Sequence, residues 1–260
     1  MKKIIKLSAI KNKIFDILFP QNIKCIFCGD ELNETSHNCT CENCYPILSF
    51  INNECDRCGT PVNPENIGVC LNCKTRNFNF CSARSVFGYC DEVLNVVQNL
   101  KYNGKRFLAS HMADFMLEKF ATLNIPADII TCVPMRHKKE KQRGYNQSGL
   151  LAQDFADKIH LPFLDCCEKV VDNPSQTTLS FDERMKNVKD TFKFKKEFKQ
   201  AIKDKVVLII DDVITTGATT SELSKVLKEH GAKECFVLSF AHSFKENNIN
   251  LFKQLYLTNN

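Results

Sequence analysis

Two adjacent aspartates, followed by threonines around a single glycine, are the residues whose types and spacing best suggest chemistry. They belong to the stretch VVLIIDDVITTGATTSEL, residues 206–223, which begins as an aliphatic run and ends as the polar start of a helix. We expect a buried parallel strand here, and the carboxyl ends of such strands lie where open α/β sheets bind ligands. Asp211 and Asp212 would therefore emerge into a crevice rather than into bulk solvent.

The residues after the aspartates predict an anion site. Residues 215–219 would form a turn whose backbone N–H groups converge before a helix begins, and converging amides together with the helix dipole attract phosphate. Gly217 allows a positive φ or a close backbone approach. Carboxylates beside such a cradle suit a ligand that is both phosphorylated and hydroxylated, such as a sugar phosphate, and they can hold a hydrated Mg²⁺. The alternative is a purely structural turn, because Asp and Thr are also good helix caps.

Cysteine is the unusual feature of the composition. The chain has 260 residues and 15 cysteines, nine of which lie between Cys25 and Cys73. Four C-x-x-C pairs suit metal knuckles better than a disulfide scaffold. They predict zinc ligands at Cys25, Cys28, Cys41, Cys44, Cys55, Cys58, Cys70 and Cys73. The spacing leaves open whether one or two Zn²⁺ ions bind and whether the knuckles pair sequentially or crosswise.

An all-cysteine ligand set leaves no position for a catalytic water, so we expect the zinc to be structural. Residues 20–82 are rich in Cys, Asn and Pro and cannot bury much apolar surface alone, so zinc would replace the core that they lack. The alternative is that the zinc-ordered loops dock nucleic acid or a protein partner.

Beyond about Ser85 the pattern becomes regular. Strands are expected over 83–90, 128–134, 205–213 and 234–241, and helices over 92–102, 108–123, 144–159 and 219–231. Strands that alternate with helices predict an α/β fold, a mostly parallel sheet flanked by helices. It would be preceded by a small cysteine-rich, zinc-ribbon-like domain. The expected domains are an N-terminal amphipathic helix over 1–19, a zinc-binding double-knuckle domain over 20–82 and the α/β domain over 83–260.

Two segments concentrate positive charge. One, VPMRHKKEKQRGYNQS, follows the expected strand 128–134, and the other, LKYNGKR, covers 100–106. Cations that attract the phosphate backbone, beside an aromatic ring on which a base can stack, predict binding of single-stranded DNA. The residues concerned are Lys101, Lys105, Arg106, Lys139, Lys141 and Tyr145. The alternatives are a solvated basic loop for the first segment and an ordinary helix end for the second.

The stretch VVLIIDDVITTGATT closely resembles the phosphoribosyl-pyrophosphate (PRPP) signature of type I phosphoribosyltransferases. The resemblance implies the type I phosphoribosyltransferase fold, with catalytic Asp211 and Asp212 at the ribose hydroxyls. It places the 5′-phosphate at Thr215, Thr216, Gly217, Ala218 and Thr219, and the pyrophosphate at Arg136, Lys138 and Arg143. The segment QTTLSFDERMKNV, residues 176–188, would be the mobile hood of these enzymes, with Gln176 and Arg184 reaching the ligand.

The whole chain narrows the resemblance. The cysteine knuckles, LKYNGKRFLA, VPMRHKKEKQRGYNQS, QTTLSFDERMKNV and the PRPP signature follow one another as in the ComF competence family, of the ComFC type. This resemblance covers nearly the full length. It implies a role in natural transformation, with PRPP, Mg²⁺ and single-stranded DNA bound on the cytoplasmic side of DNA uptake. Phosphoribosyl transfer would go to an unidentified acceptor.

Other functions stay open at this point. The protein could bind PRPP or single-stranded DNA without transferring ribose, or its zinc domain could be an adaptor for a competence helicase or ATPase. A sister branch of the family is linked to gluconate or DNA-nutrient utilisation. Mutation of the aspartates and the salt dependence of DNA binding separate these readings.

The N-terminal stretch MKKIIKLSAIKNKIFDILFP carries lysines and an aspartate within its apolar run, so it does not read as a signal peptide. We expect an amphipathic helix packed on protein, with contact to a membrane surface as the alternative. No apolar run reaches the ~18 residues of a membrane span. Scattered cysteines outside the knuckles are typical of reduced cytosolic thiols, so a cytoplasmic location is expected.

Overall fold

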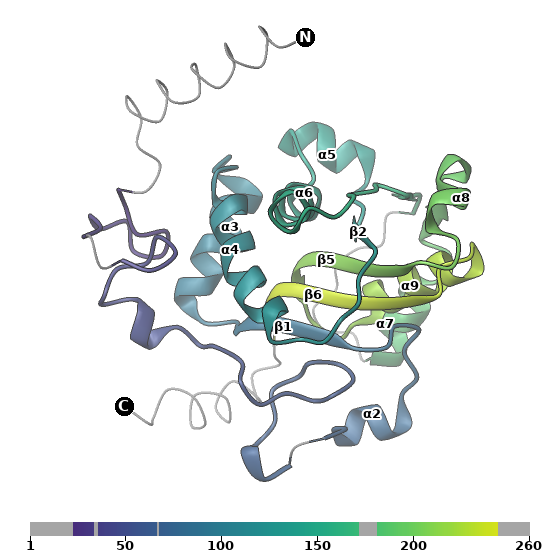
Figure 1. The fold of residues 1–260 in the computed structure, drawn as a ribbon, viewed down its shortest axis with the longest axis horizontal. Coiled ribbons are helices and arrows are strands. Elements are labelled where there is room, and N and C mark those ends of the chain that lie inside the picture. Colours follow the sequence, from purple (N-terminus) through teal and green to yellow (C-terminus); the bar gives the residue numbers. More distant parts are fainter. Residues whose placement is uncertain (1–22, 34–35, 67, 172–180, 244–260) are drawn as a thin grey trace, which may run out of the picture. The chain divides into compact units, whose positions relative to one another are not determined.

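The computed structural model describes residues 23–33, 36–66, 68–171 and 181–243. The chain divides into two compact units, Met1–Leu48 and Ser49–Asn260 (Figure 1). This division falls inside the range 20–82 that we expected to form one zinc-binding domain. The expected helix over 1–19 lies outside the described residues.

The first unit is described from residue 23 and consists mainly of tight turns. Cys25 N donates to Asp30 O at 2.7 Å, and an isolated bridge joins Lys24 to Glu31. The regular element here is the short 3₁₀ helix η1, Tyr45–Ile47. Such a segment has little apolar core, as the sequence predicts.

A four-stranded parallel sheet forms the centre of the second unit. It contains β1 (Ala83–Gly88), β2 (Ile129–Cys132), β5 (Val206–Ile214) and β6 (Glu234–His242), in the order β1-β6-β5-β2. Each neighbouring pair is parallel. The nearly continuous aliphatic run of β5 fits a strand buried on both faces.

Helices cover both faces of this sheet (Figure 1). On one side lie α3 (Asp91–Tyr102), α4 (Leu108–Ala121) and α6 (Gln147–Ile159). On the other lie α9 (Ala218–Glu229) and α7 (Phe181–Val188). The expected fold class, a parallel sheet flanked by helices, is confirmed.

Several elements had no predicted counterpart. The basic segment was expected as a loop, but His137–Arg143 form the helix α5. Its residues are mostly good helix formers, and Gly144 ends it in the left-handed conformation, with φ 87°. An antiparallel pair, β3 (Cys167–Lys169) with β4 (Phe192–Phe194), and the short helix α8 (Lys199–Ile202) were also not predicted.

The second group of knuckle cysteines belongs to the same unit as the sheet. Helix α2 (Leu71–Thr75) carries Cys73, and the 3₁₀ turn η2 (Pro64–Asn66) precedes it. A further 3₁₀ turn, η3 (Lys196–Phe198), lies much later in the chain, just before α8. Cys55, Cys58 and Cys73 are buried in one apolar cluster with side chains of β5, β6 and α9. These knuckles therefore share a core with the α/β sheet.

Among the helices within the described ranges, none has the length and apolar character needed to cross a bilayer.

Candidate functional site

The aspartate pair is buried within β5. Asp211 is 9% exposed and Asp212 is 3% exposed, and the strand continues through them to Ile214. The strand was expected over 205–213 and ends at Ile214, so the two carboxylates lie three and two residues before its last residue. Hydrogen bonding to β6, in which Asp211 lies beside Ser239, prolongs the strand past the pair.

The start of α6 supplies hydrogen-bond donors to the pair. Ser148 Oγ lies 2.9 Å from Asp211 Oδ1 and 3.2 Å from Asp212 Oδ1. Gln147 Nε2 donates to Asp212 Oδ1 at 3.2 Å. Because β2 lies beside β5 and is followed in the chain by α5 and then α6, the sheet topology brings these side chains to the carboxylates.

A lysine from α3 completes the cluster. Lys101 Nζ lies 2.5 Å from Asp212 Oδ2, and both side chains are largely removed from solvent. We expected Lys101 to be part of a DNA-binding surface, but the structure places its ammonium on the aspartate pair. An ion pair in such a site interacts far more strongly than one on the surface.

The two carboxyls have opposite electrostatic environments. Burial, together with the adjacent Asp212 charge, raises the pKa of Asp211 well above its ordinary value. Burial would also raise the pKa of Asp212, but the Lys101 ammonium and the hydrogen bonds from Lys101 and Gln147 hold it below its ordinary value. The pair therefore favours one ionised carboxylate, at Asp212, and a neutral Asp211.

The turn after β5 forms as expected and leads into α9. Gly217 occupies the N-cap position with φ 75°, and the first helical bond runs from Ser221 N to Gly217 O at 2.9 Å. Since glycine has no side chain to cap the helix, the amides of Ala218, Thr219 and Thr220 precede the helical ladder without a side-chain cap. This is the arrangement in which helix N-termini bind anions.

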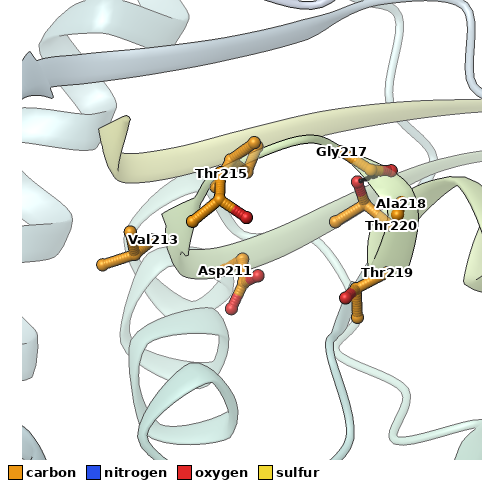
Figure 2. Close-up of a pocket in the computed structure, with 8 residues that line it drawn as sticks. Asp211, Val213, Thr215, Gly217, Ala218, Thr219 and Thr220 are labelled. Carbon is orange, nitrogen blue, oxygen red and sulfur yellow. Dashed lines mark hydrogen bonds between the residues drawn. The ribbon is translucent and has the colours of Figure 1, made fainter. Parts of the chain in front are cut away.

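A hollow opens between Asp211 and this turn (Figure 2). Asp211, Thr215, Gly217, Ala218 and Thr219 line it, together with Val213, Ile214 and Thr220. Thr216, also predicted to contact phosphate, is half-buried and is not part of this lining. A carboxylate, hydroxyls and helix amides therefore meet around one small space.

In the described part of the predicted hood, residues 181–188, Arg184 reaches this turn. Arg184, on α7, donates from Nη1 to Thr215 Oγ1 at 3.1 Å. Its guanidinium thus brings positive charge to the threonine turn. Gln176, the other predicted hood residue, lies outside the described residues.

The three residues predicted to bind pyrophosphate have different surroundings in the structure. Arg136 donates to the carbonyl of Val170, and Arg143 donates to the Gln147 side chain. Lys138 is exposed on α5. Arg143 therefore touches the aspartate cluster indirectly, through the Gln147 amide.

The predicted DNA-binding residues lie in two kinds of environment. Lys105, Arg106, Lys139 and Lys141 are exposed. Tyr145, in contrast, is buried, its hydroxyl donates to the carbonyl of Leu100, and Arg106 lies 4.5 Å from its ring centroid. Tyr102, which is 72% exposed, offers a ring to a base at this surface.

Both predicted cysteine sites form, and the knuckles pair sequentially. One quartet is Cys25, Cys28, Cys41 and Cys44, and the other is Cys55, Cys58, Cys70 and Cys73. Within each quartet the sulfur atoms lie within 4.8 Å of one another. Four convergent thiolates fit tetrahedral Zn²⁺, so the donor chemistry of both sites supports zinc.

Sequence reasoning missed the roles of Gln147 and Ser148. A signal was present, because both follow a strand expected to be parallel to the one that carries the aspartates. Polar residues after adjacent parallel strands meet at one edge of the sheet. The role of Lys101 had no comparable signal, because its reach to Asp212 depends on how α3 packs.

Comparisons with known proteins agree with this organisation. Residues 14–74 match the model of the double zinc ribbon domain. Competence protein F of Haemophilus influenzae is 29% identical over 85% of this chain and 98% of its own length. Competence protein ComFC of Streptococcus pneumoniae is 24% identical over 82% of this chain and 96% of its own. The DNA utilization protein YhgH of Escherichia coli is 25% identical over 68% of this chain and 79% of its own length.

Among solved structures, two matches are to enzymes of nucleotide metabolism. The adenine phosphoribosyltransferase of Thermoanaerobacter pseudethanolicus matches with a TM-score of 0.35 and 15% identity, covering 58% of this chain and 84% of its own. The allosteric regulatory enzyme of purine biosynthesis matches with a TM-score of 0.38 and 18% identity, covering 55% and 30%.

The fold and site define a zinc-ribbon protein whose parallel α/β sheet carries a buried aspartate pair beside a threonine-rich turn. Within that class, the chain is a homologue of the proteins named competence protein F and ComFC. The resemblance to the ComF family predicted from the motifs is thereby confirmed.

Proposed function

We propose that the hollow between β5 and α9 binds PRPP together with Mg²⁺. The observation that carries this proposal is the meeting, around one space, of Asp211, one member of the buried aspartate pair, with an uncapped helix start. A phosphorylated pentose needs both parts: donors for its phosphate and acceptors for its ring hydroxyls.

Each part of the site has a role in this proposal. The amides of Ala218 and Thr219 and the hydroxyls of Thr215, Thr216 and Thr219 hold the 5′-phosphate, and Gly217 permits its close approach. The ribose hydroxyls donate to Asp211 and Asp212. Arg184, which already contacts Thr215, adds positive charge over the phosphate when the hood closes.

The donor chemistry also fits a magnesium ion. Lys101 compensates one negative charge of the pair, and burial beside the Asp212 charge raises the pKa of Asp211, so ionising both carboxylates calls for a further positive charge. A hydrated Mg²⁺ held near Asp211 would supply that charge and would stabilise the pyrophosphate leaving group. The exposed Lys138 and the two arginines, Arg136 and Arg143, are the cations from α5 proposed to face pyrophosphate.

The reaction that follows is phosphoribosyl transfer to an acceptor whose identity stays open. A nucleophile of the acceptor forms a bond to C1 of the ribose, and the bond from C1 to pyrophosphate breaks. Cations near the leaving group stabilise the charge that develops on it. By analogy with the relatives named for competence, we place this activity in natural transformation, on the cytoplasmic side of DNA uptake. The relative named for DNA utilization supports a nutritional role instead.

Calorimetric titration with PRPP and Mg²⁺ tests the proposal. Wild-type protein should bind, and the Asp211→Asn/Asp212→Asn variant should lose binding while keeping its circular dichroism spectrum. Asp165→Asn is the matched control, because that carboxylate is exposed and its ion pair is with Lys195, away from the aspartate pair. Binding that survives in the double variant would place the ligand elsewhere.

A second candidate function, single-stranded DNA binding, is favoured by a surface that two distant segments build together. Arg106 Nη2 donates to Gly144 O at 2.6 Å, and Arg143 lies 5.2 Å from the ring centroid of Tyr102. The basic surface defined by these contacts carries Lys105, Arg106, Lys138, Lys139 and Lys141, and beside them Tyr102 and the half-exposed Phe107. Exposed rings among cations suit stacking of unpaired bases.

The salt dependence of binding to a fluorescent oligothymidylate tests this surface. Replacing Lys139 and Lys141 by alanine should make the slope of log K against log salt shallower by about 1–2 phosphate contacts. Tyr102→Ala should weaken binding by ~1–3 kcal/mol without changing that slope. Lys193→Ala, an exposed lysine on β4, is the control. An unchanged slope in the double variant would exclude the surface.

A further inference from the structure

One short segment lies between the second cysteine quartet and the turn that begins α9. Residues 78–80 follow the last knuckle and precede β1, and their aromatic side chains are buried: Phe78 is 8% exposed and Phe80 is 3% exposed. The two rings are stacked with centroids 4.7 Å apart. Nothing in the site described so far uses them.

The stacked rings form the floor under Gly217. A Cβ atom at this glycine would lie 3.2 Å from Phe78 Cε1 and 3.4 Å from Phe80 Cζ. Gly217 therefore has its left-handed backbone pressed against the rings, and the path of the turn depends on where the rings lie. In a close-packed interior such a contact leaves little freedom to shift.

Asn79, between the two phenylalanines, is bonded to the first turn of α9. Its backbone N donates to Ser221 Oγ at 3.0 Å, and its Nδ2 donates to Ser221 O at 3.2 Å. Ser221 is fully buried and gives the first backbone bond of α9, to Gly217 O. Asn79 thus holds the residue at which the helical ladder begins.

The same segment is bonded to the cysteine knuckle. Arg57, between Cys55 and Cys58, donates from Nη2 to Phe78 O at 3.4 Å, and its carbonyl accepts from Ala83 N at 2.9 Å. Gly59, with φ 70°, packs so closely that a Cβ there would lie 2.5 Å from Ala83 O. The knuckle therefore holds both ends of the 78–83 stretch.

We propose that Phe78, Asn79 and Phe80 are positioning residues that couple the second zinc site to the proposed phosphate-binding turn. Zinc at Cys55, Cys58, Cys70 and Cys73 fixes the knuckle, the knuckle fixes the 78–80 segment, and that segment holds Gly217 and Ser221 in place. The first quartet belongs to the other compact unit. The consequence for PRPP rests on the proposed function; the consequence for the turn does not.

Hydrogen exchange measured by mass spectrometry on full-length protein tests the coupling without any ligand. Asn79→Ala keeps all cysteines and should speed amide exchange in residues 217–222 on the order of tenfold, the effect of losing about one hydrogen bond. Asn95→Ala, an exposed asparagine on α3, is the matched control and should leave these residues unchanged.

A pair of cysteine variants tests the role of zinc. Cys70→Ser and Cys28→Ser should each lower the zinc count, as read by native mass spectrometry, but only Cys70→Ser should speed exchange in residues 217–222. If Cys70→Ser fails to fold, the Asn79→Ala comparison still decides. Unchanged exchange in Asn79→Ala, or equal acceleration in both cysteine variants, would overturn the coupling.

Titration with PRPP and Mg²⁺ separates this inference from the proposed function. Faster exchange with a PRPP affinity about tenfold weaker in Asn79→Ala supports both. Faster exchange in a protein whose wild type binds no PRPP supports the coupling and refutes the ligand. Normal exchange in a protein that binds PRPP refutes the coupling alone.

Discussion

At the scale of single residues, the electrostatics of the site depend on one lysine that serves a buried acid. Lys101 Nζ and Asp212 Oδ2 lie 2.5 Å apart with side-chain exposures of 22% and 4%. Lys195 and Asp165 have the same separation, but their exposures are 28% and 52%. The two pairs have the same N–O separation and different solvent exposure, so comparing them separates the effect of burial from that of distance.

Lys101→Met should destabilise the fold far more than Lys195→Met. Removing Lys101 leaves a buried carboxylate unpaired, which costs about 3 kcal/mol. Removing Lys195 breaks a more exposed pair, worth less than about 1 kcal/mol. Urea unfolding of the two variants measures the difference, and adding Asp212→Asn to Lys101→Met should restore most of the loss. Equal destabilisation by the two single substitutions would contradict this account.

Asp211→Asn should stabilise the ligand-free protein at neutral pH. Because burial raises the pKa of Asp211 in the fold, the native state prefers the protonated acid. The stability that this acid contributes is complete below its unfolded pKa of about 3.9 and is lost as pH rises toward the folded pKa. The neutral amide avoids that loss, so the variant should gain about 1 kcal/mol at pH 7, or ~2–4 °C in Tm.

Thermal unfolding of wild type and variant, at steps of about one pH unit from roughly pH 3 to pH 8, measures this gain on both sides of the ordinary Asp pKa. The gain should vanish at the acidic end, where Asp211 is neutral in both states. A variant less stable than wild type at neutral pH would show that Asp211 is ionised in the native protein.

At the scale of elements, the junction from β5 to α9 combines a backbone requirement with a packing requirement. Gly217 has φ 75° and lies against the stacked rings of Phe78 and Phe80. Gly149, inside α6, has no positive φ, and its would-be Cβ meets only Asn146 at ordinary contact distance, 3.4 Å. A Gly→Ala substitution should therefore change stability in opposite directions at these two positions.

Gly217→Ala should lower stability by about 1–2 kcal/mol, because alanine is strained at this φ and its methyl group pushes on the rings. Gly149→Ala should raise stability by ~0.5–1 kcal/mol, since glycine is a poor residue in a helix interior. Chemical denaturation of both variants provides the comparison. A stabilising Gly217→Ala would mean that the turn adopts another backbone path in solution.

At the scale of the whole molecule, the division into units predicts where the chain can be cut. Residues 49–260 retain one cysteine quartet and the Phe78 and Phe80 rings that pack against Gly217, whereas residues 83–260 lose both. We expect the 49–260 fragment to bind one zinc, read by native mass spectrometry, and to unfold cooperatively. The 83–260 fragment should expose the apolar floor of α9 and aggregate. A soluble, cooperatively folded 83–260 fragment would support the boundary at 82/83 that we predicted from the sequence.

The sequence by itself determined the strands of the parallel sheet, four of the helices that cover it, and the chemistry that depends on nearest neighbours. The C-x-x-C spacing predicted the zinc ligands, and the alternation of apolar and amphipathic runs predicted all four strands of the parallel sheet and the helices α3, α4, α6 and α9. The aspartates and the glycine turn were predicted because a strand, a turn and a helix follow one another directly. These are local consequences of residue type and spacing.

Only the tertiary structure decided which distant groups meet. The pairing of Lys101 with Asp212, the burial of Tyr145 and the rings under Gly217 join segments far apart in the sequence. Each depends on how helices and knuckles pack on the sheet, and packing of that kind leaves no periodic signal in the chain. The charge state of the aspartate pair follows from that packing, because burial and a neighbouring cation set a pKa and neither can be read from the order of residues.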